Sequence, residues 1–333
     1  MGECARESGA KEGSTGGFMK YCFILNPAAG KGDLTEKIRS ALTEYAGERR
    51  KDVELYHTTG KNDATEYVRR RVALDPAEEY RFYACGGDGT LCEVVNGVMS
   101  LSDRERVSVG LIPSGTGNDF VRNFSPKEFF LQIDHQLDAS PHPVDLISCN
   151  DMYAVNMVNI GFDCEVVDQT ARIKRHPMVP AKMAYIVGLA LTLLRKPGLH
   201  ANISRDGEEA EEGRYLLNTF ANGSFCGGGF HSNPKSNLDD GCIDALFVNN
   251  IGRMKFLSLV GDYKKGTHLT PKFDQVLKHR KLRTVSFSFD RETNVSVDGE
   301  LIRVKRLDLS VVPRVLNFLI PKGCVVREEA AVL

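Results

Sequence analysis

The sequence lacks the features of a membrane-spanning or strongly charged protein. No apolar run reaches the roughly 18 to 20 residues that a helix needs to cross a bilayer, and the first residues, Met1 to Gly17, contain no apolar signal core. Basic and acidic residues nearly balance, with 43 Lys and Arg against 44 Asp and Glu, so the composition gives no indication of a nucleic-acid partner. We therefore expect a cytoplasmic chain with a disordered leader over residues 1–18.

The sequence also lacks paired cysteines. Its 9 cysteines are odd in number, widely scattered and without any C-x-x-C spacing. Zinc sites usually take their ligands from such pairs, and a disulfide framework uses an even number of cysteines. We therefore predict reduced thiols, as in a cytoplasmic protein.

Two kinds of apolar pattern divide the chain, whose 333 residues are too many for one ordinary domain. From residue 21 to residue 112, short apolar runs alternate with segments of helical period, which predicts βα units and a parallel sheet. After Pro141 the apolar residues alternate with period two, which predicts strands. We predict a doubly wound α/β nucleotide-binding domain over residues 19–143 and a mainly β, sandwich-like domain over 144–326, of which residues 313–322 could pack back on the first domain.

Three glycine-rich turns follow three of the predicted strands of the first domain. They are Asn26-Pro27-Ala28-Ala29-Gly30-Lys31-Gly32, Gly86-Gly87-Asp88-Gly89-Thr90 and Pro113-Ser114-Gly115-Thr116-Gly117-Asn118-Asp119. In an open α/β sheet, ligands bind beyond the carboxyl ends of the strands, where glycine lets backbone N–H groups approach phosphate oxygens. One such turn alone is often only a tight turn, but three in order predict a phosphate site. None has the form of a Walker P-loop or a dinucleotide fingerprint.

Three further local patterns predict secondary structure. Thr90 and Glu93 have the spacing of a capping box at the start of the helix after the second turn. Near the end of the chain, residues 307–311 and 315–320 read as two separate strands. In the second domain, a helical stretch is expected at about residues 183–194.

Together with a late Asp298-Gly299-Glu300 segment, the three turns resemble the diacylglycerol kinase catalytic family, which includes soluble bacterial lipid kinases and is related to sphingosine and ceramide kinases. The resemblance runs from about Tyr21 to Lys322. It implies an ATP-dependent, Mg²⁺-requiring lipid kinase that transfers the γ-phosphate of ATP to the hydroxyl of diacylglycerol or a related long-chain alcohol.

The resemblance also implies which residues contact ATP. Thr58 is among them, although Asn62 stands where the family more often has glycine; Asn tolerates the same positive φ. The full set is Asn26, Pro27, Ala28, Ala29, Gly30, Thr58, Gly86, Gly87, Asp88, Gly89, Thr90, Leu91, Cys92, Glu93, Thr116, Asn118 and Asp119.

A metal and a general base are implied in the second domain. The resemblance places Mg²⁺ on the Asp240 carboxylate and the backbone carbonyls of Asn237 and Cys242, ligands that suit this hard cation. An ordinary Asp-Gly turn is the alternative at that position. For the base that takes the proton of the lipid hydroxyl, Glu300 is the first choice and Asp298 the second, while Asp88 could position the nucleotide's Mg²⁺ or the base.

Membrane contact is expected from the segment at residues 172–196. No acidic residue occurs between Asp168 and Asp206, and Arg172, Lys174 and other basic residues flank the apolar run 183–194. Such a run either lies on an anionic membrane or forms a buried helix with solvated ends, and the sequence favours neither. A lipid acceptor implies peripheral membrane association; a homodimer is left open.

Two other functions compete with a lipid kinase. An NAD kinase would need a threonine-glycine-serine-threonine substrate block in the second domain, which the sequence does not contain. A catalytically dead nucleotide-binding module would be expected to lose Asp88 or both late carboxylates, and all three are present.

Overall fold

The computed structural model describes residues 18–30, 34–45, 47, 52–174 and 198–327. The predicted leader and the predicted helix at 183–194 lie outside these ranges. The same holds for Arg175 and the basic residues 182, 195 and 196, and the side chains of Arg172 and Lys174 are not described either. Within the described ranges, no helix has both the length and the apolar character needed to cross a bilayer.

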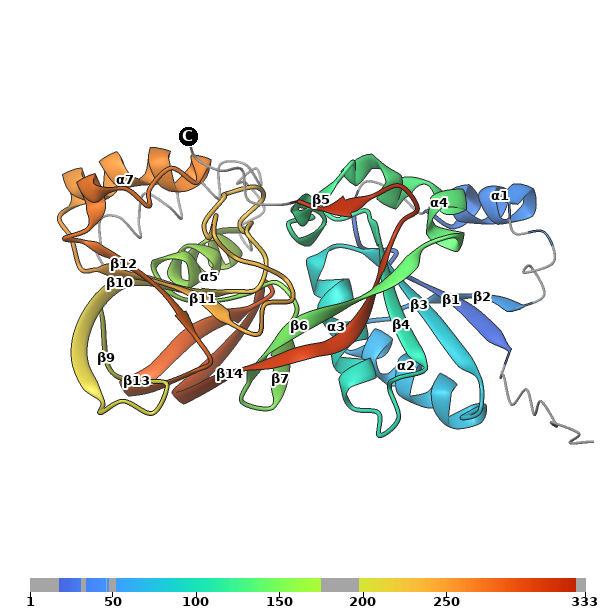
Figure 1. Cartoon of the computed structure of the whole chain (residues 1–333), viewed down its shortest axis with the longest axis horizontal. Helices are drawn as coiled ribbons and strands as arrows, with labels where there is room; N and C mark the ends of the chain where they lie inside the picture. The colour runs from blue at the N-terminus through green and yellow to red at the C-terminus, as the bar shows by residue number, and fades with distance from the viewer. Residues whose placement is uncertain (1–17, 31–33, 46, 48–51, 175–197, 328–333) are drawn as a thin grey trace, which may run out of the picture.

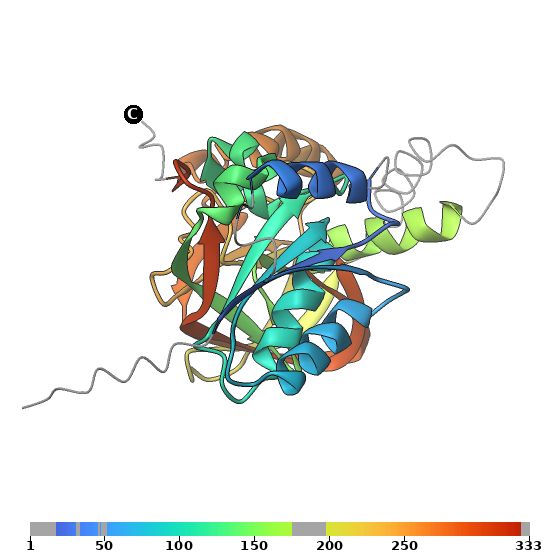
Figure 2. The same cartoon turned by 90° about the vertical axis from the view of Figure 1, so that its right-hand side faces the viewer.

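The first domain is the predicted doubly wound α/β unit. Its parallel strands β1 (Met19–Leu25), β2 (Val53–His57), β3 (Glu79–Gly86) and β4 (Val107–Pro113) pair in the order β4-β3-β1-β2. Its helices are α1 (Thr35–Tyr45), α2 (Asp63–Leu74), α3 (Asp88–Met99) and the short α4 (Ile133–Leu137). In Figures 1 and 2, α1 and α4 lie on the opposite side of the sheet from α2 and α3.

Alternation along β1 explains the two helical layers. Cys22 and Ile24 belong to the core that includes α2 and α3, whereas Tyr21 and Phe23 belong to the core that includes α1 and α4. All four side chains are buried, as expected for a parallel strand covered on both faces.

The second domain is built mainly of antiparallel strands. They are β6 (Ser140–Cys149), β7 (Met152–Ala154), β8 (Met157–Gly161), β9 (Leu199–Arg205), β10 (Glu211–Ala221), β11 (Ile243–Asn249), β12 (Leu277–Leu282), β13 (Thr284–Val297) and β14 (Glu300–Ile320). Both β10 and β13 pair with β8 through one part and with β9 through another, so the strands curve around an apolar core. Two helices, α5 (Phe162–Lys174) and α7 (Arg253–Lys265), contribute to a second core with residues of β10 and β11.

Strand β14 joins the two domains. Its 21 residues pair with β13 at the start, with β6 further on, and in parallel with β4 at Asn317 and Phe318. The prediction of two strands at 307–311 and 315–320 is wrong, because β14 continues through an irregularity between Val312 and Leu316, where Arg314 has φ +48°. The predicted boundary at 143/144 lies inside β6, which runs beside β14 through both domains.

The remaining elements are short. Strand β5 (Phe124–Ser125) pairs with β15 (Val325–Val326), and the 3-10 turns are η2 (Phe120–Asn123), η3 (Lys127–Leu131) and η4 (Pro271–Phe273).

Candidate active site

The three glycine-rich turns of the first domain touch one another. Ser114 N–H donates to the carbonyl of Gly86 at 2.8 Å. A Cβ added to Gly115 would lie 2.5 Å from the Cα of Gly87, and one added to Gly30, which has φ +72°, would lie 2.0 Å from the carbonyl oxygen of Ser114. Glycine is therefore required where these backbones meet at the carboxyl edge of β1, β3 and β4.

This contact gives a first testable prediction. Gly115→Ala should separate the second and third turns, because its Cβ cannot fit beside Gly87. Overpacking of this kind costs about 1 to 3 kcal/mol of stability, and a displaced phosphate cradle should weaken ATP binding by about 10- to 100-fold. Calorimetric titration with ATP measures the effect.

Gly60→Ala is the matched control, because a Cβ at Gly60 meets no atom within 4 Å. It should retain wild-type affinity for ATP. Equal affinities of the Gly115→Ala and Gly60→Ala proteins would contradict a nucleotide site at the turns.

Polar side chains fix the shape of the first turn. The amide of Asn26 donates to Thr90 Oγ1 at 3.0 Å, and its oxygen accepts the N–H of Ala28 at 3.0 Å. Thr58 N–H donates to the carbonyl of Leu25 at 2.8 Å, which places Thr58 beside the same edge of the sheet. The side chains of Asn26 and Thr90 therefore join the first two turns directly.

Three predicted ATP contacts in α3, directly after the second turn, direct their side chains away from it. Leu91 and Cys92 are buried in α3, so only their backbone could face a nucleotide. The carboxylate of Glu93 accepts the N–H groups of Asn62 and Ala64, at 2.9 and 3.3 Å, at the start of α2. The predicted capping box is wrong, because α3 begins at Asp88 with Gly87 as its N-cap; Glu93 stabilises the neighbouring helix instead.

Two carboxylates hold the third turn. Asp88 accepts the N–H groups of Asp119 and Phe120, at 2.9 and 3.1 Å. Asp119 in turn accepts the N–H of Gly228, in the glycine-rich loop of the second domain, at 2.8 Å. Burial raises the pKa of Asp119. The third turn thus connects the first domain to the second. The same turn carries Asn118 and the exposed Thr116.

Asp298 lies in the tight turn between β13 and β14, where it and Gly299 have φ of +47° and +92°. Its side chain is buried and accepts three backbone N–H groups, from Val155 at 2.7 Å, Asn156 at 3.0 Å and Met157 at 2.8 Å. Burial raises the pKa of Asp298 to about 6. The carboxylate therefore ties this turn to the chain entering β8.

Glu300, two residues later, reaches the first domain. Its Oε1 lies 3.7 Å from the position that a Cβ on Gly89 would take, at the first turn of α3. Its Oε2 lies 2.5 Å from Nζ of Lys61, and the hydrogen bond to Glu300 raises the pKa of Lys61. A half-exposed carboxylate from the second domain therefore faces the glycine-rich turn of the first.

Sequence reasoning missed Lys61. It lies in the loop between β2 and α2, between the predicted Thr58 and Asn62, and its position there was the one available signal. A lysine next to a phosphate site could bind a phosphate oxygen as a point charge.

The predicted metal ligands lie at the turn before β11. Asp240 Oδ1 accepts the N–H of Cys242 at 3.0 Å, and Oδ2 lies 2.5 Å from Nζ of Lys281. Asn237 uses its side-chain oxygen to accept the N–H of Asp239. Because both Asp240 oxygens are engaged, one of them by a cation, these residues as they stand do not fit a metal ion. Across the described ranges, no cluster of three or more His, Cys, Asp or Glu side chains could hold one.

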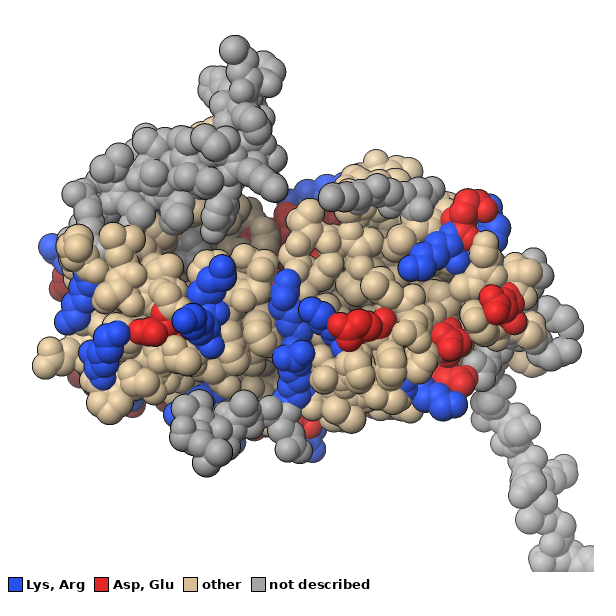
Figure 3. Space-filling model, turned by 90° about the horizontal axis from the view of Figure 1, so that it is seen from above, with Lys and Arg blue, Asp and Glu red and all other residues tan. Residues whose placement is uncertain are grey.

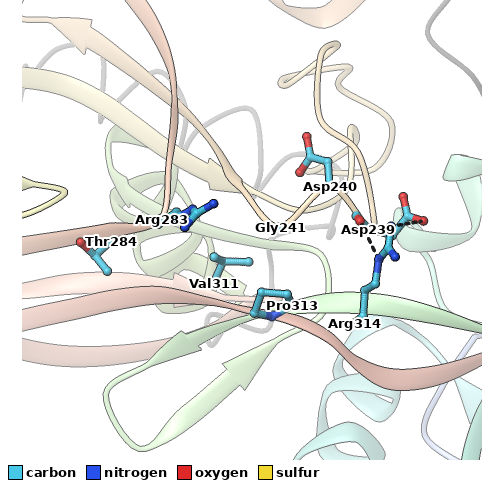
Figure 4. A pocket seen from close by; sticks show the side chains of 8 residues that line it. All are labelled: Asp239, Asp240, Gly241, Arg283, Thr284, Val311, Pro313 and Arg314. Atoms are coloured by element: carbon cyan, nitrogen blue, oxygen red, sulfur yellow. Dashed lines mark hydrogen bonds and ion pairs between the residues drawn. The ribbon is translucent and has the colours of Figure 1, made fainter.

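Figure 4 shows the surroundings of this turn, a cavity of about 480 Å³ at the irregular part of β14. Arg314 lies beside Asp239, to whose carbonyl oxygen its Nε donates at 3.2 Å. A metal ion at Asp240 would have to replace the ammonium group of Lys281.

Metal binding at this turn is testable without an activity assay. If Mg²⁺ binds Asp240, Lys281→Met should increase the rise in Tm that Mg²⁺ causes, and Asp240→Asn should abolish it. Lys278→Met, on the same strand β12, is the control and should behave as the wild type. If Mg²⁺ does not change the Tm of any of these proteins, the metal site is excluded and the alternative, an ordinary Asp-Gly turn, is supported.

Comparisons with known proteins agree with this arrangement. The sequence profile of the diacylglycerol kinase catalytic domain matches residues 20–149, and that of the YegS C-terminal NAD kinase beta sandwich-like domain matches residues 156–320. A Stenotrophomonas maltophilia protein named "Probable lipid kinase YegS-like" is 27% identical, over 92% of this chain and 97% of its own length. The diacylglycerol kinase of Bacillus subtilis is 27% identical, over 83% of this chain and 88% of its own.

A solved structure shows the same fold. The crystal structure of a diacylglycerol kinase from Bacillus anthracis superposes with a TM-score of 0.67 at 22% identity, covering 92% of this chain and 98% of that one. The two profiles together span nearly all of the described chain, and the relatives match along most of their length. Both findings indicate the same family. The chain therefore belongs to the diacylglycerol kinase catalytic family of kinases.

Proposed function

We propose that this kinase transfers the γ-phosphate of ATP to the hydroxyl group of diacylglycerol or a related long-chain lipid alcohol. The observation that carries the proposal is the position of Glu300, a carboxylate of the second domain that faces the glycine-rich turn at the start of α3. The relatives named as lipid kinase and diacylglycerol kinase support a lipid as the acceptor.

In the proposed reaction, the three turns hold the phosphates of ATP through backbone N–H groups and the N-terminus of α3. Glu300 takes the proton of the acceptor hydroxyl as its oxygen attacks the γ-phosphorus. The bond from that phosphorus to the β,γ-bridging oxygen breaks, and ADP leaves. Phosphoryl transfer asks a protein mainly for positioning and charge stabilisation, which these groups supply.

Between the two late carboxylates, the contacts favour Glu300 as the base. Asp298 is buried and accepts three backbone N–H groups, so we assign it a positioning role. Magnesium is proposed to arrive with ATP, where it would neutralise charge on the phosphates. No step is assigned to a metal held at Asp240.

The acceptor class is tested by incubating the protein with labelled ATP, Mg²⁺ and a panel of lipids in mixed micelles, with NAD as a soluble acceptor in parallel. We expect a labelled phospholipid from diacylglycerol or another long-chain alcohol in the panel. Labelled NADP without any lipid product would favour the NAD kinase alternative, and would refute the proposal.

Lys61 offers a test of the crevice itself. Lys61→Met removes the cation that pairs with Glu300 and that lies where phosphates are expected. If Lys61 also binds ATP, the KM for ATP should rise about tenfold or more, whereas loss of the ion pair alone should lower kcat at unchanged KM. Steady-state kinetics distinguish the two. Lys305→Met, on an exposed part of β14, is the control. A variant with wild-type kcat and KM would exclude Lys61 from the site.

A further inference from the structure

Helix α7 has two apolar faces. Phe256, Leu259 and Tyr263 are buried in the core that α7 shares with β10 and β11. On the outer face, Met254 is 80% exposed and Leu257, one turn along, is 54% exposed. Isolated exposed apolar residues are common on protein surfaces. In the described ranges, however, no other two large exposed apolar side chains lie one turn apart on one helix.

The charges of α7 are nearly all of one sign. Its sequence contains Arg253, Lys255, Lys264 and Lys265, against a single acidic residue, Asp262. That acid is already paired, with Nζ of Lys272 at 3.1 Å. Figure 3 looks down on this side of the molecule, and in the half formed by the second domain several Lys and Arg side chains lie on a mostly uncharged surface, with acidic side chains among them.

The far end of α7 is connected to the active site. His231 N–H donates to the carbonyl of Lys264 at 3.2 Å, and Nζ of Lys264 lies 5.6 Å from the ring centre of Phe230. Phe230 ends the glycine-rich loop whose Gly228 N–H donates to Asp119 of the third turn. A surface bound to α7 would therefore lie next to the loop that borders the site.

We propose that the outer face of α7, defined by Met254, Leu257, Lys255 and Lys265, docks on the anionic surface of a lipid bilayer. The inference rests on the proposed function, because a membrane-borne acceptor requires the kinase to reach a bilayer. Two exposed apolar side chains within a basic helix suit an interface of anionic headgroups and acyl chains. A second copy of this chain fits less well, because a two-fold contact through α7 would bring like charges together.

The test measures binding of the full chain to vesicles by co-sedimentation. Vesicles of phosphatidylcholine alone are compared with vesicles that also contain phosphatidylserine. We expect the wild type to favour the anionic vesicles, and Met254→Glu/Leu257→Glu to lose that binding by about tenfold or more. Lys255→Glu/Lys265→Glu should weaken it similarly. Leu74→Glu on α2, where Leu74 is 75% exposed, and Lys305→Glu should bind as the wild type.

Each outcome bears on the proposal. Equal vesicle binding by all variants, or no preference of the wild type for anionic vesicles, would overturn it. So would a wild-type dimer in sedimentation that Met254→Glu/Leu257→Glu dissociates without any vesicle binding, because a second copy would then cover α7. Lipid phosphorylation by the wild type in neutral detergent micelles is measured in parallel. Its absence with intact vesicle binding would refute the proposed function and leave the docking surface standing.

Discussion

Glu300→Gln should lower phosphoryl transfer by about 10²- to 10⁴-fold, the contribution usual for a general base, while ATP affinity stays nearly unchanged. The amide has almost the size of the carboxylate but cannot take the proton of the acceptor hydroxyl. The base removes the proton in the transition state and takes no part in nucleotide binding. The substitution should therefore lower kcat without lowering the affinity for ATP. Single-turnover kinetics together with calorimetric ATP titration measure both quantities.

The substitution also releases Lys61, so a matched control is needed. Glu292→Gln, at an exposed position of the neighbouring strand β13, should leave both rate and affinity at wild-type values. Lys61→Met separates the loss of the ion pair from the loss of the base. Near-wild-type turnover by a folded Glu300→Gln protein would exclude Glu300 as the base and leave Asp298 as the remaining candidate.

The parts of the fold that could be predicted are those with a local signal. Three of the four parallel strands of the first domain, β1, β3 and β4, contain a short apolar run that is followed by a glycine-rich turn, and both features can be read within about ten residues. The convergence of the turns then follows from the general geometry of parallel sheets. The Asp-Gly turn before Glu300 could be predicted for the same reason, because Asn, Asp and Gly are the residues that most readily adopt positive φ.

The parts that could not be predicted depend on contacts between distant segments. Lys61 and Glu300 are 239 positions apart, and nothing near either residue indicates the other. The three N–H donors to Asp298 come from residues 155–157, more than 140 positions earlier. The sequence did not predict that β14 is one continuous strand. Two adjacent apolar residues, Val311 and Val312, are followed by Pro313, and this breaks the period-two alternation that identifies a strand.

Asp298 makes a prediction about stability and pH. Its pKa of about 6 in the folded protein lies above the ordinary value of 3.8. Between these two pH values the folded state holds a proton that the unfolded state has lost. This group's contribution to stability is therefore fully present below the unfolded pKa and is lost as pH rises through 6. From about pH 5 to pH 7.5 this difference in proton binding lowers the free energy of unfolding by roughly 1.4 kcal/mol.

Asp298→Asn isolates this contribution, because the amide does not titrate and all other groups are shared. The variant should be less stable than the wild type by about 1 to 3 kcal/mol, since an amide cannot satisfy three backbone donors. The gap should widen by roughly 1.4 kcal/mol from about pH 7.5 to pH 5, because only the wild type gains from protonation. Urea unfolding of both proteins at the two pH values measures the gap. A gap that stays constant or narrows at the lower pH would show that Asp298 ionises as an ordinary carboxyl and that its burial does not disfavour the charge.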